Sequence, residues 1–319
     1  MKKLKFLTLA LITVLTCAGA ASCSKDDGGV TPPGQSEIEK ETGMRLTRVG
    51  NYRFNYDDKG RCIGVDDLSG YDDDDITIDW DKGELIATDS DDDMESAPVK
   101  FKTNSKGYIT EFTQSWNYKE EDYSSKGSGK ASLSYDKFGH LTKATFDSSE
   151  SGTEDGEKFT FKGSSVYTLT WENGNLVNLK HAWEYLEDGE REKGTDNYEV
   201  TYDRTAENVY KQWTEGLLDQ VFNFGFSVLG HVGMFGVGTA NFPSHIEIDE
   251  EDYHTNYSVS VSTNSDDLIS SERVGGWTYN YWTYNYSYDD VDTRSAAFDN
   301  TLPVKARKIL FPRHRKVQK

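Results

Sequence analysis

The chain has 319 residues, and its 35 Lys and Arg against 55 Asp and Glu give a formal net charge of -20. A chain this acidic repels phosphate backbones, and it lacks the patches of mixed basic and aromatic residues that follow a nucleic acid, so we expect no nucleic-acid partner. Only three cysteines occur. No disulfide framework is therefore expected, and stability has to come from a hydrophobic core.

The first 22 residues have the three parts of a secretion signal. The segment begins with lysines, continues with an apolar run at residues 7–15, and ends with small residues at 18–22. The apolar run is too short for a helix that spans a bilayer. We predict that residues 1–22 are a lipoprotein signal peptide, and that its removal leaves 319 − 22 = 297 residues.

The end of this leader, Ala20-Ala21-Ser22-Cys23, resembles the lipobox of bacterial lipoproteins. It lacks the leucine usual three positions before the cysteine, but Cys17 is a poorer alternative because Thr16 precedes it. The resemblance implies that Cys23 becomes the acylated N-terminus and that the membrane is a partner through this anchor. Residues 23–44 then form a lipidated flexible linker, with Pro32-Pro33-Gly34 inside it.

The residues after the cysteine bear on localisation. Lys25-Asp26-Asp27 resembles the acidic surface-export tag of Bacteroides-type lipoproteins. The resemblance implies a lipid-anchored protein on the cell-surface face of the outer membrane. If these charges are only a solvated spacer, the periplasmic face is the alternative.

The body of the chain repeats one turn pattern. An aromatic residue or threonine is followed by Asp, Asn or Glu, then by polar residues and a glycine, and an apolar residue stands two places after the glycine. The acid or amide caps a tight turn, and glycine supplies the positive φ that short hairpin loops need, so each copy predicts two antiparallel strands. The copies are 56–62, 80–85, 103–109, 135–141 and 171–176.

The flanking segments alternate between apolar and polar residues, as half-buried strands do; Tyr52, Phe54 and Tyr56 give one example. We therefore predict a single all-β domain at residues 45–300, an antiparallel hairpin meander that forms a large curled sheet or barrel. Strands such as Lys158–Lys162 carry too many charges for a lipid-facing band, so the barrel is expected to be porin-like but soluble. Cys62 takes an apolar slot and is expected to be a core thiol.

Tyr56-Asp57-Asp58-Lys59-Gly60-Arg61-Cys62-Ile63-Gly64-Val65 resembles a tyrosine-aspartate (YD) repeat. The layout of Arg45 to Asp290 is also similar to a Bacteroides-type lipoprotein family of unknown function with a porin-like β fold. This resemblance implies an antiparallel meander curling toward a barrel. It implies no activity and no catalytic residue.

The hairpin pattern breaks at residues 205–243. Val209, Trp213, Leu217 and Val221 recur four apart, which predicts a short amphipathic helix, and a glycine-rich apolar stretch follows. The glycine spacing does not match a phosphate loop. We expect this insert to pack into the sheet or to cap it.

The strand at Gly276 to Tyr288 is the most aromatic in the chain. Aromatic faces bind the apolar faces of sugar rings, but aromatic stripes also fill the cores of sheets. Both interpretations stay open for this strand. The candidate ligand-binding residues are Trp277, Tyr279, Tyr281, Trp282 and Tyr284.

Signals for other chemistry are weak. His245, Glu247 and Asp249 share one face of a predicted strand, but no second motif supports a metal site. Serine-hydrolase and other catalytic motifs are missing, and paired carboxylates for a glycosidase cannot be recognised from sequence. We therefore expect no catalytic residue, no metal, no cofactor and no enzyme activity.

The chain ends in a basic tail, residues 301–319. The tail can fold back on the acidic body, or it can contact anionic lipid or lipopolysaccharide phosphate. From Val304 onward it has no acidic residue, and its cations are Lys305, Arg307, Lys308, Arg313, Arg315, Lys316 and Lys319.

Together these features predict a cell-envelope lipoprotein that acts as a surface-exposed binding module for a glycan or a protein. The alternatives are a structural or accessory subunit that docks to an outer-membrane complex and, third, a hydrolase that uses paired carboxylates. The identity of the ligand and the oligomeric state are not encoded in any of these patterns.

Overall fold

The computed structural model describes residues 43–68, 75–88, 97–119, 123–220, 226–250, 253–275 and 281–290. Within them every strand pairs antiparallel with its neighbour in sequence, and the last strand pairs with the first to close a barrel. The predicted all-β hairpin meander is therefore confirmed, and of the two predicted forms the closed barrel is the one adopted. Its strands are β1 (Met44–Val49), β2 (Tyr52–Tyr56), β3 (Cys62–Asp67), β4 (Asp75–Asp79), β5 (Glu84–Thr88), β6 (Val99–Thr103), β7 (Ile109–Lys119), β8 (Tyr123–Tyr135), β9 (Leu141–Glu154), β10 (Glu157–Glu172), β11 (Asn175–Glu187), β12 (Glu190–Glu207), β13 (Asn241–Glu250), β14 (Tyr253–Thr263), β15 (Ile269–Gly275) and β16 (Tyr281–Asp290).

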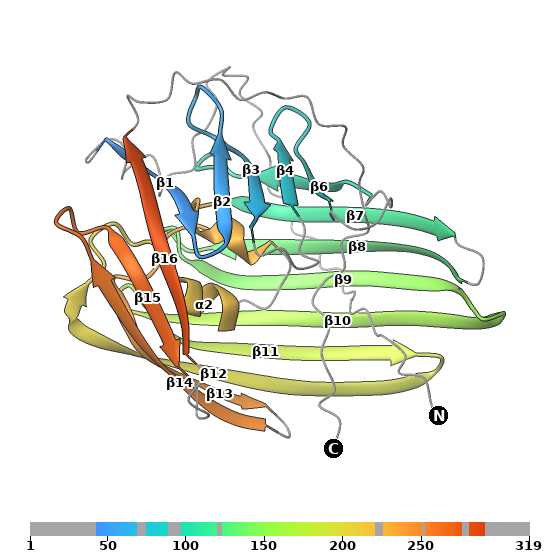
Figure 1. Ribbon diagram of the computed structural model, residues 1–319. Helices are drawn as coiled ribbons and strands as arrows, with labels where there is room; N and C mark the ends of the chain where they lie inside the picture. The colour runs from blue at the N-terminus through green and yellow to red at the C-terminus, as the bar shows by residue number, and fades with distance from the viewer. Residues whose placement is uncertain are drawn as a thin grey trace.

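The barrel is asymmetric along its axis. Strands β7 to β12 are long, and in Figure 1 they extend to the right, well beyond the shorter strands on either side of them. We call the end that holds the turns at 57–60, 104–107 and 136–139 the proximal end. The opposite end, which holds the hairpin tips at 155–156 and 188–189, is the distal end.

The proximal turns are built as the repeat pattern predicts. At the β8–β9 turn, one carboxylate oxygen of Asp136 accepts hydrogen bonds from the amides of Phe138 and His140, at 2.8 and 2.9 Å. Gly139 has φ +96°, which side chains with a Cβ rarely adopt. The same pair of side-chain hydrogen bonds forms at Asp57 and at Asn104.

Two further turns use this geometry without glycine. Asn264 accepts from the amides of Asp266 and Leu268, and Asp267 takes the positive φ of 60° in the glycine position. Asn208 likewise binds the amide of Gln212, and Lys211 has φ +49°. The repeat pattern missed both because it required glycine, whereas Asp and occasionally other residues tolerate this conformation.

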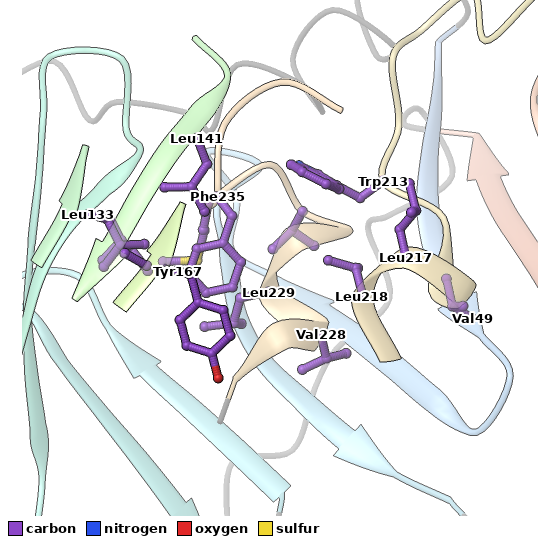
Figure 2. Close-up of a cluster of buried hydrophobic side chains, with 14 of the residues drawn as sticks. Val49, Leu133, Leu141, Tyr167, Trp213, Leu217, Leu218, Val228, Leu229 and Phe235 are labelled. Carbon is purple, nitrogen blue, oxygen red and sulfur yellow. The ribbon is translucent and has the colours of Figure 1, made fainter. Parts of the chain in front are cut away.

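The insert between β12 and β13 fills the proximal half of the barrel, and we call its described residues, 208–220 and 226–240, the plug. Figure 1 shows α2 (Glu215–Gln220) enclosed by the strands, and Figure 2 shows plug side chains against residues of the wall. A single turn of 3-10 helix, η1 (Ser227–Gly230), follows. The prediction that the insert packs into the sheet is confirmed, since its large apolar side chains are buried: Trp213, Leu217, Leu218, Val228, Leu229, Val232, Met234 and Phe235.

The amphipathic helix predicted from Val209 onward is wrong at its start. Asn208 closes a turn on Gln212 by accepting from its amide and donating to its carbonyl at 2.8 Å, so this segment is not helical. Val209 is 45% exposed, and α2 begins only at Glu215. Trp213 and Leu217 are buried as predicted, whereas Val221 lies outside the described residues.

A buried carboxylate joins the plug to the barrel. Glu272 on β15 accepts from the amides of Glu215 and Gly216, at 2.7 and 3.0 Å, and from the hydroxyl of Tyr286 on β16 at 3.0 Å. It thereby satisfies amides that the first turn of α2 leaves free. Burial, reinforced by the charge of Glu215, raises the pKa of Glu272 to about 7.

The outer face of the long strands is polar. On β8, for example, the outward positions are serines and lysines, whereas the inward Ala131 and Leu133 are buried. No helix among the described residues is long and apolar enough to cross a membrane. Cys62 is fully buried, and burial raises the pKa of its thiol to about 12, so the predicted core thiol is confirmed.

The packing of the plug predicts a large effect of truncation inside it. We expect Leu229→Ala to lower the free energy of unfolding by about 2 to 5 kcal/mol, because Leu229 is fully buried and the change leaves a cavity. The control Val209→Ala should change it by less than about 0.5 kcal/mol. Urea denaturation of the leaderless protein measures both, and equal effects of the two substitutions would contradict the role of the plug in the core.

Glu272 predicts a pH dependence of stability. Its pKa is about 7 in the folded chain and about 4.5 when unfolded, so between these values the folded state holds a proton that the unfolded state has released. The stabilisation is complete below about pH 4.5 and is lost as the pH rises through 7, by on the order of 3 kcal/mol. Denaturation at a series of pH values should show this slope, and Glu272→Gln should flatten it; an unchanged slope in the variant would refute the assignment.

Candidate functional site

Three aromatic rings on the long strands lie over glycines of the neighbouring strand. In each pair the two residues are direct cross-strand partners, and a Cβ on the glycine would come within 2.7 Å of a ring atom. The rings therefore occupy the space that a side chain would fill and lie against the backbone. Phe159 and Trp183 are half-buried, whereas Trp116 is buried, at 9% exposure. The pairs are Trp116 with Gly127, Phe159 with Gly152 and Trp183 with Gly194.

Neighbouring rings extend this surface. Tyr123 stacks on Phe159 with 5.9 Å between ring centroids, and Tyr185 stacks next to Trp183 at 5.4 Å with an angle of 11° between the planes. Phe161 lies 6.3 Å from Tyr185. We define the distal inner wall as the inward-facing residues of β7 to β12 that lie between the level of His181 and the hairpin tips of the distal end.

The charge on this wall is of one sign. Strand alternation places carboxylates at its inward positions, and within the described residues it has no inward-facing Lys or Arg. The carboxylates near the hairpin tips are exposed or half-buried, whereas the carboxylates of Glu150 and Asp196 are buried. The acidic residues of the wall are Glu150, Glu154, Glu157, Glu187, Glu190, Glu192 and Asp196.

The outer face of β8 to β12 has the opposite character. Its eight cations outnumber its six outward-facing acids, Asp147, Glu172, Glu184, Glu199, Asp203 and Glu207. Charge is therefore divided across the sheet, with anionic groups inside and mainly cationic groups outside. The outward-facing cations are Lys126, Lys130, Lys143, Lys158, Lys162, Lys180, Arg191 and Lys193.

Two buried polar side chains of the wall, Gln114 and Glu150, lie on the same inner surface as Trp116. One carboxylate oxygen of Glu150 accepts from the indole of Trp116 at 3.2 Å and from the hydroxyl of Tyr123 at 3.3 Å. Gln114 donates to the carbonyl of Ala97, but its own side-chain oxygen is buried and has no hydrogen-bond partner within the described part of the chain. A buried acceptor without a donor costs stability, which a ligand hydroxyl or ammonium would recover.

A hydrogen-bonded chain of Ser165, His181 and Asp196 crosses three strands where the wall meets the core. The serine hydroxyl lies 2.5 Å from Nε2 of His181, and Nδ1 of His181 lies 2.9 Å from Asp196. The imidazole also stacks on Tyr167, with 4.1 Å between ring centroids. Sequence reasoning missed this chain because its members are 15 and 16 residues apart and meet only through the strand register.

This connectivity is that of a serine nucleophile, but its surroundings do not favour acyl transfer. Acyl transfer needs free N–H donors for the oxyanion, and β10 pairs on both sides of Ser165, so its amides are used in the sheet. The serine is also only 3% exposed. The three residues therefore form a satisfied polar network that supports the wall.

The candidate residues of the aromatic strand separate into three groups. Trp277 and Tyr279, like Cys23, lie outside the described residues, and for Tyr281 only the backbone pairing with Gly275 is described. Trp282 is 45% exposed, and its ring lies 6.3 Å from that of Tyr257. Tyr284 is half-buried against the core. Ligand binding by these residues stays a prediction.

Further along β16 the aromatic residues hold the plug. The hydroxyl of Tyr286 lies between the amide of Glu215 and the carboxylate of Glu272. The hydroxyl of Tyr288 accepts from the side chain of Gln212 at 3.1 Å. The proximal half of this strand is therefore core, and only its distal start faces the barrel mouth.

His245, Glu247 and Asp249 do share one face of β13, the outer one. His254 lies beside them, 3.5 Å from Glu247 and 3.9 Å from Asp249. Across the described ranges, no three His, Cys, Asp or Glu side chains are grouped as metal ligands.

A shallow depression of about 610 Å³ lies on the outside of β10 to β12. Val166 and Ala182 contribute its apolar part, and Glu184 and Lys193 contribute its charges. Most of its lining residues face outward, so it lies mainly on the opposite side of the sheet from the distal inner wall, although Trp183 and Gly194 also contribute to its lining.

A scan against protein-family models finds no match, and neither does a search of curated proteins. Among solved structures, the chain is similar to a porin-like protein from Bacteroides vulgatus ATCC 8482, with 12% identity, a TM-score of 0.51, and coverage of 76% of this chain and 98% of that one. A porin-like protein from Bacteroides uniformis ATCC 8492 also matches, with 13% identity, a TM-score of 0.46, and coverage of 75% and 90%. The first likeness shows a porin-like fold, in agreement with the predicted resemblance, whereas no comparison supports the YD repeat.

The buried His181–Asp196 pair predicts a specific stability effect. We expect Asp196→Ala to cost about 3 to 5 kcal/mol of unfolding free energy, because the imidazole then loses its buried partner. Glu199→Ala, on the outer face of the same strand, should cost less than about 0.5 kcal/mol. Chemical denaturation measures both, and a small effect of Asp196→Ala would show that the network does not support the wall.

Proposed function

We propose that this chain is a binding module of the cell envelope, held to a membrane by a lipid on Cys23, and that its ligand lies on the distal inner wall. The ligand is a glycan or a protein segment. The observation that carries the proposal is the set of three aromatic rings held over glycines, because two of them, Phe159 and Trp183, are only half-buried and can offer a ring face to a ligand.

The chemistry of the wall supports a ligand with both apolar and polar faces. The C–H face of a pyranose packs on an indole or phenol ring, and its hydroxyls pair with carboxylates and amides at the ring edge. Trp116 has both kinds of group beside it, since its indole donates to Glu150 and the free oxygen of Gln114 lies two residues away on the same strand face.

A second aromatic group lies at the distal mouth. Trp282 at the start of β16 and Tyr257 on β14 are close to each other, and Trp282 is exposed. We include the predicted aromatic strand in the same proposed site as the long-strand rings.

The leader supports the proposed location. A lipid on Cys23 and a linker at residues 23–44 would hold the barrel beside a membrane without inserting it. Lys25-Asp26-Asp27 favours the cell-surface face of the outer membrane over the periplasmic face.

A glycan array with the leaderless protein, followed by calorimetry with the glycan that binds best, tests the proposed function. We expect Trp183→Ala and Trp282→Ala each to weaken binding about tenfold or more, equivalent to about 1.4 kcal/mol, because each removes a ring that packs on the ligand. Leu186→Ala, on the outer face of β11, is the matched control and should bind normally. An array without hits would count against the glycan form, and loss of folding instead of binding would show that the rings are core residues.

A further inference from the structure

The division of charge across the long strands points to an occupant of the distal inner wall within this same chain. We propose that the basic C-terminal tail, Val304–Lys319, docks on the acidic distal inner wall as an intramolecular ligand. The docking itself needs only the charges and rings of the wall. Its regulatory consequence, that the tail must leave before another ligand enters, rests on the proposed function.

The two surfaces are complementary in charge. The tail has seven cations and no acid after Val304, and the wall has seven carboxylates with no inward Lys or Arg in its described residues. The acids nearest the tips, including Glu154, Glu157 and Glu192, are exposed and can pair without a large desolvation cost. The outer face of β8 to β12 would repel the tail, because its cations outnumber its acids.

The rings of the wall favour arginine in particular. A guanidinium packs over an aromatic face and still forms hydrogen bonds to carboxylates at its edge. Trp183 and Tyr185 are half-buried, and Glu192 accepts a hydrogen bond from the hydroxyl of Tyr185. An arginine of the tail would therefore find a ring and a carboxylate side by side.

The length of the chain permits this docking. Asp290 pairs with Met44 at the proximal end, and 319 − 290 = 29 residues follow it. These residues can span up to about 100 Å when extended. The ten residues of β16 cover about 33 Å of the path, and the greater length of the 18-residue β12 adds about 27 Å, which leaves enough chain to follow the wall.

Attachment to the barrel makes weak contacts sufficient. Exposed ion pairs are individually weak and are screened by salt. A tethered segment, however, is present at an effective concentration in the millimolar range, so several weak pairs hold it in place. High salt, or a ligand with higher affinity for the rings, would release the tail.

Carbodiimide cross-linking of the leaderless protein with its complete tail tests the docking, because it joins a lysine amine to a carboxylate in direct contact. We expect cross-links from Lys305, Lys308 or Lys316 to the exposed acids of the wall, identified by mass spectrometry. We also expect their loss in about 1 M salt, where the Debye length falls to about 3 Å.

The matched variants lie on the same two strands. Glu157→Gln with Glu192→Gln removes two inward charges of β10 and β12, and we expect loss of the cross-links to these strands and weaker cross-links to Glu154. Glu172→Gln with Glu199→Gln removes two outward charges of the same strands and should leave the wall cross-links unchanged. Equal cross-linking to outward acids would overturn the proposal, as would tail lysines that cross-link to no acid of the wall.

Vesicles with anionic lipid provide the competing partner. If the tail binds such vesicles and the wall cross-links are absent without them, the tail is a membrane contact and the proposal fails. The glycan measurements with Trp183→Ala are independent of this result, because a wall that binds glycans need not bind the tail. Failure of one proposal is therefore distinguishable from failure of the other.

Discussion

The interior of this barrel is too wide to be filled from its own wall. Eight strands enclose a space that inward side chains can fill, and sixteen enclose far more. The plug resolves this in the proximal half, where Trp213, Leu229 and Phe235 complete a core with the inward residues of the strands (Figure 2). The described residues of the plug contribute to this proximal core, and the inner surface of the distal half has a different composition.

The plug is fixed by a few polar contacts as well as by apolar packing. Glu272 caps the first amides of α2 from β15, and Tyr286 joins the same carboxylate from β16. A buried carboxylate is costly unless its hydrogen bonds are complete, so this cluster favours one position of the plug over others of equal apolar burial. The raised pKa of Glu272 reflects that cost.

The distal half is built on another principle. Its inward positions are glycine, serine, aromatic residues and acids, so rings lie against the backbone and carboxylates stand beside them. Some residues of this wall are buried, among them Trp116, Phe161 and Glu150, whereas the side chains nearer the tips are exposed or half-buried. Its composition suits contacts with a ligand that has an apolar face and a polar or cationic edge, which is the basis of both proposals made above.

The sequence by itself determined the strand content, the Asx-glycine turns such as Asp136 to Gly139, the burial of Cys62 and the packing of the insert, because these depend on local periodicity and on turn chemistry. Only the tertiary structure decided barrel closure, the start of α2, the Ser165–His181–Asp196 network and the rings over glycine. Each of these depends on contacts between segments distant in sequence, which place residues 7 to 246 positions apart side by side. Local periodicity in a sequence shows which residues share a strand face. It does not show which residues of distant strands become partners, because that is decided only when the strands pair in the folded barrel.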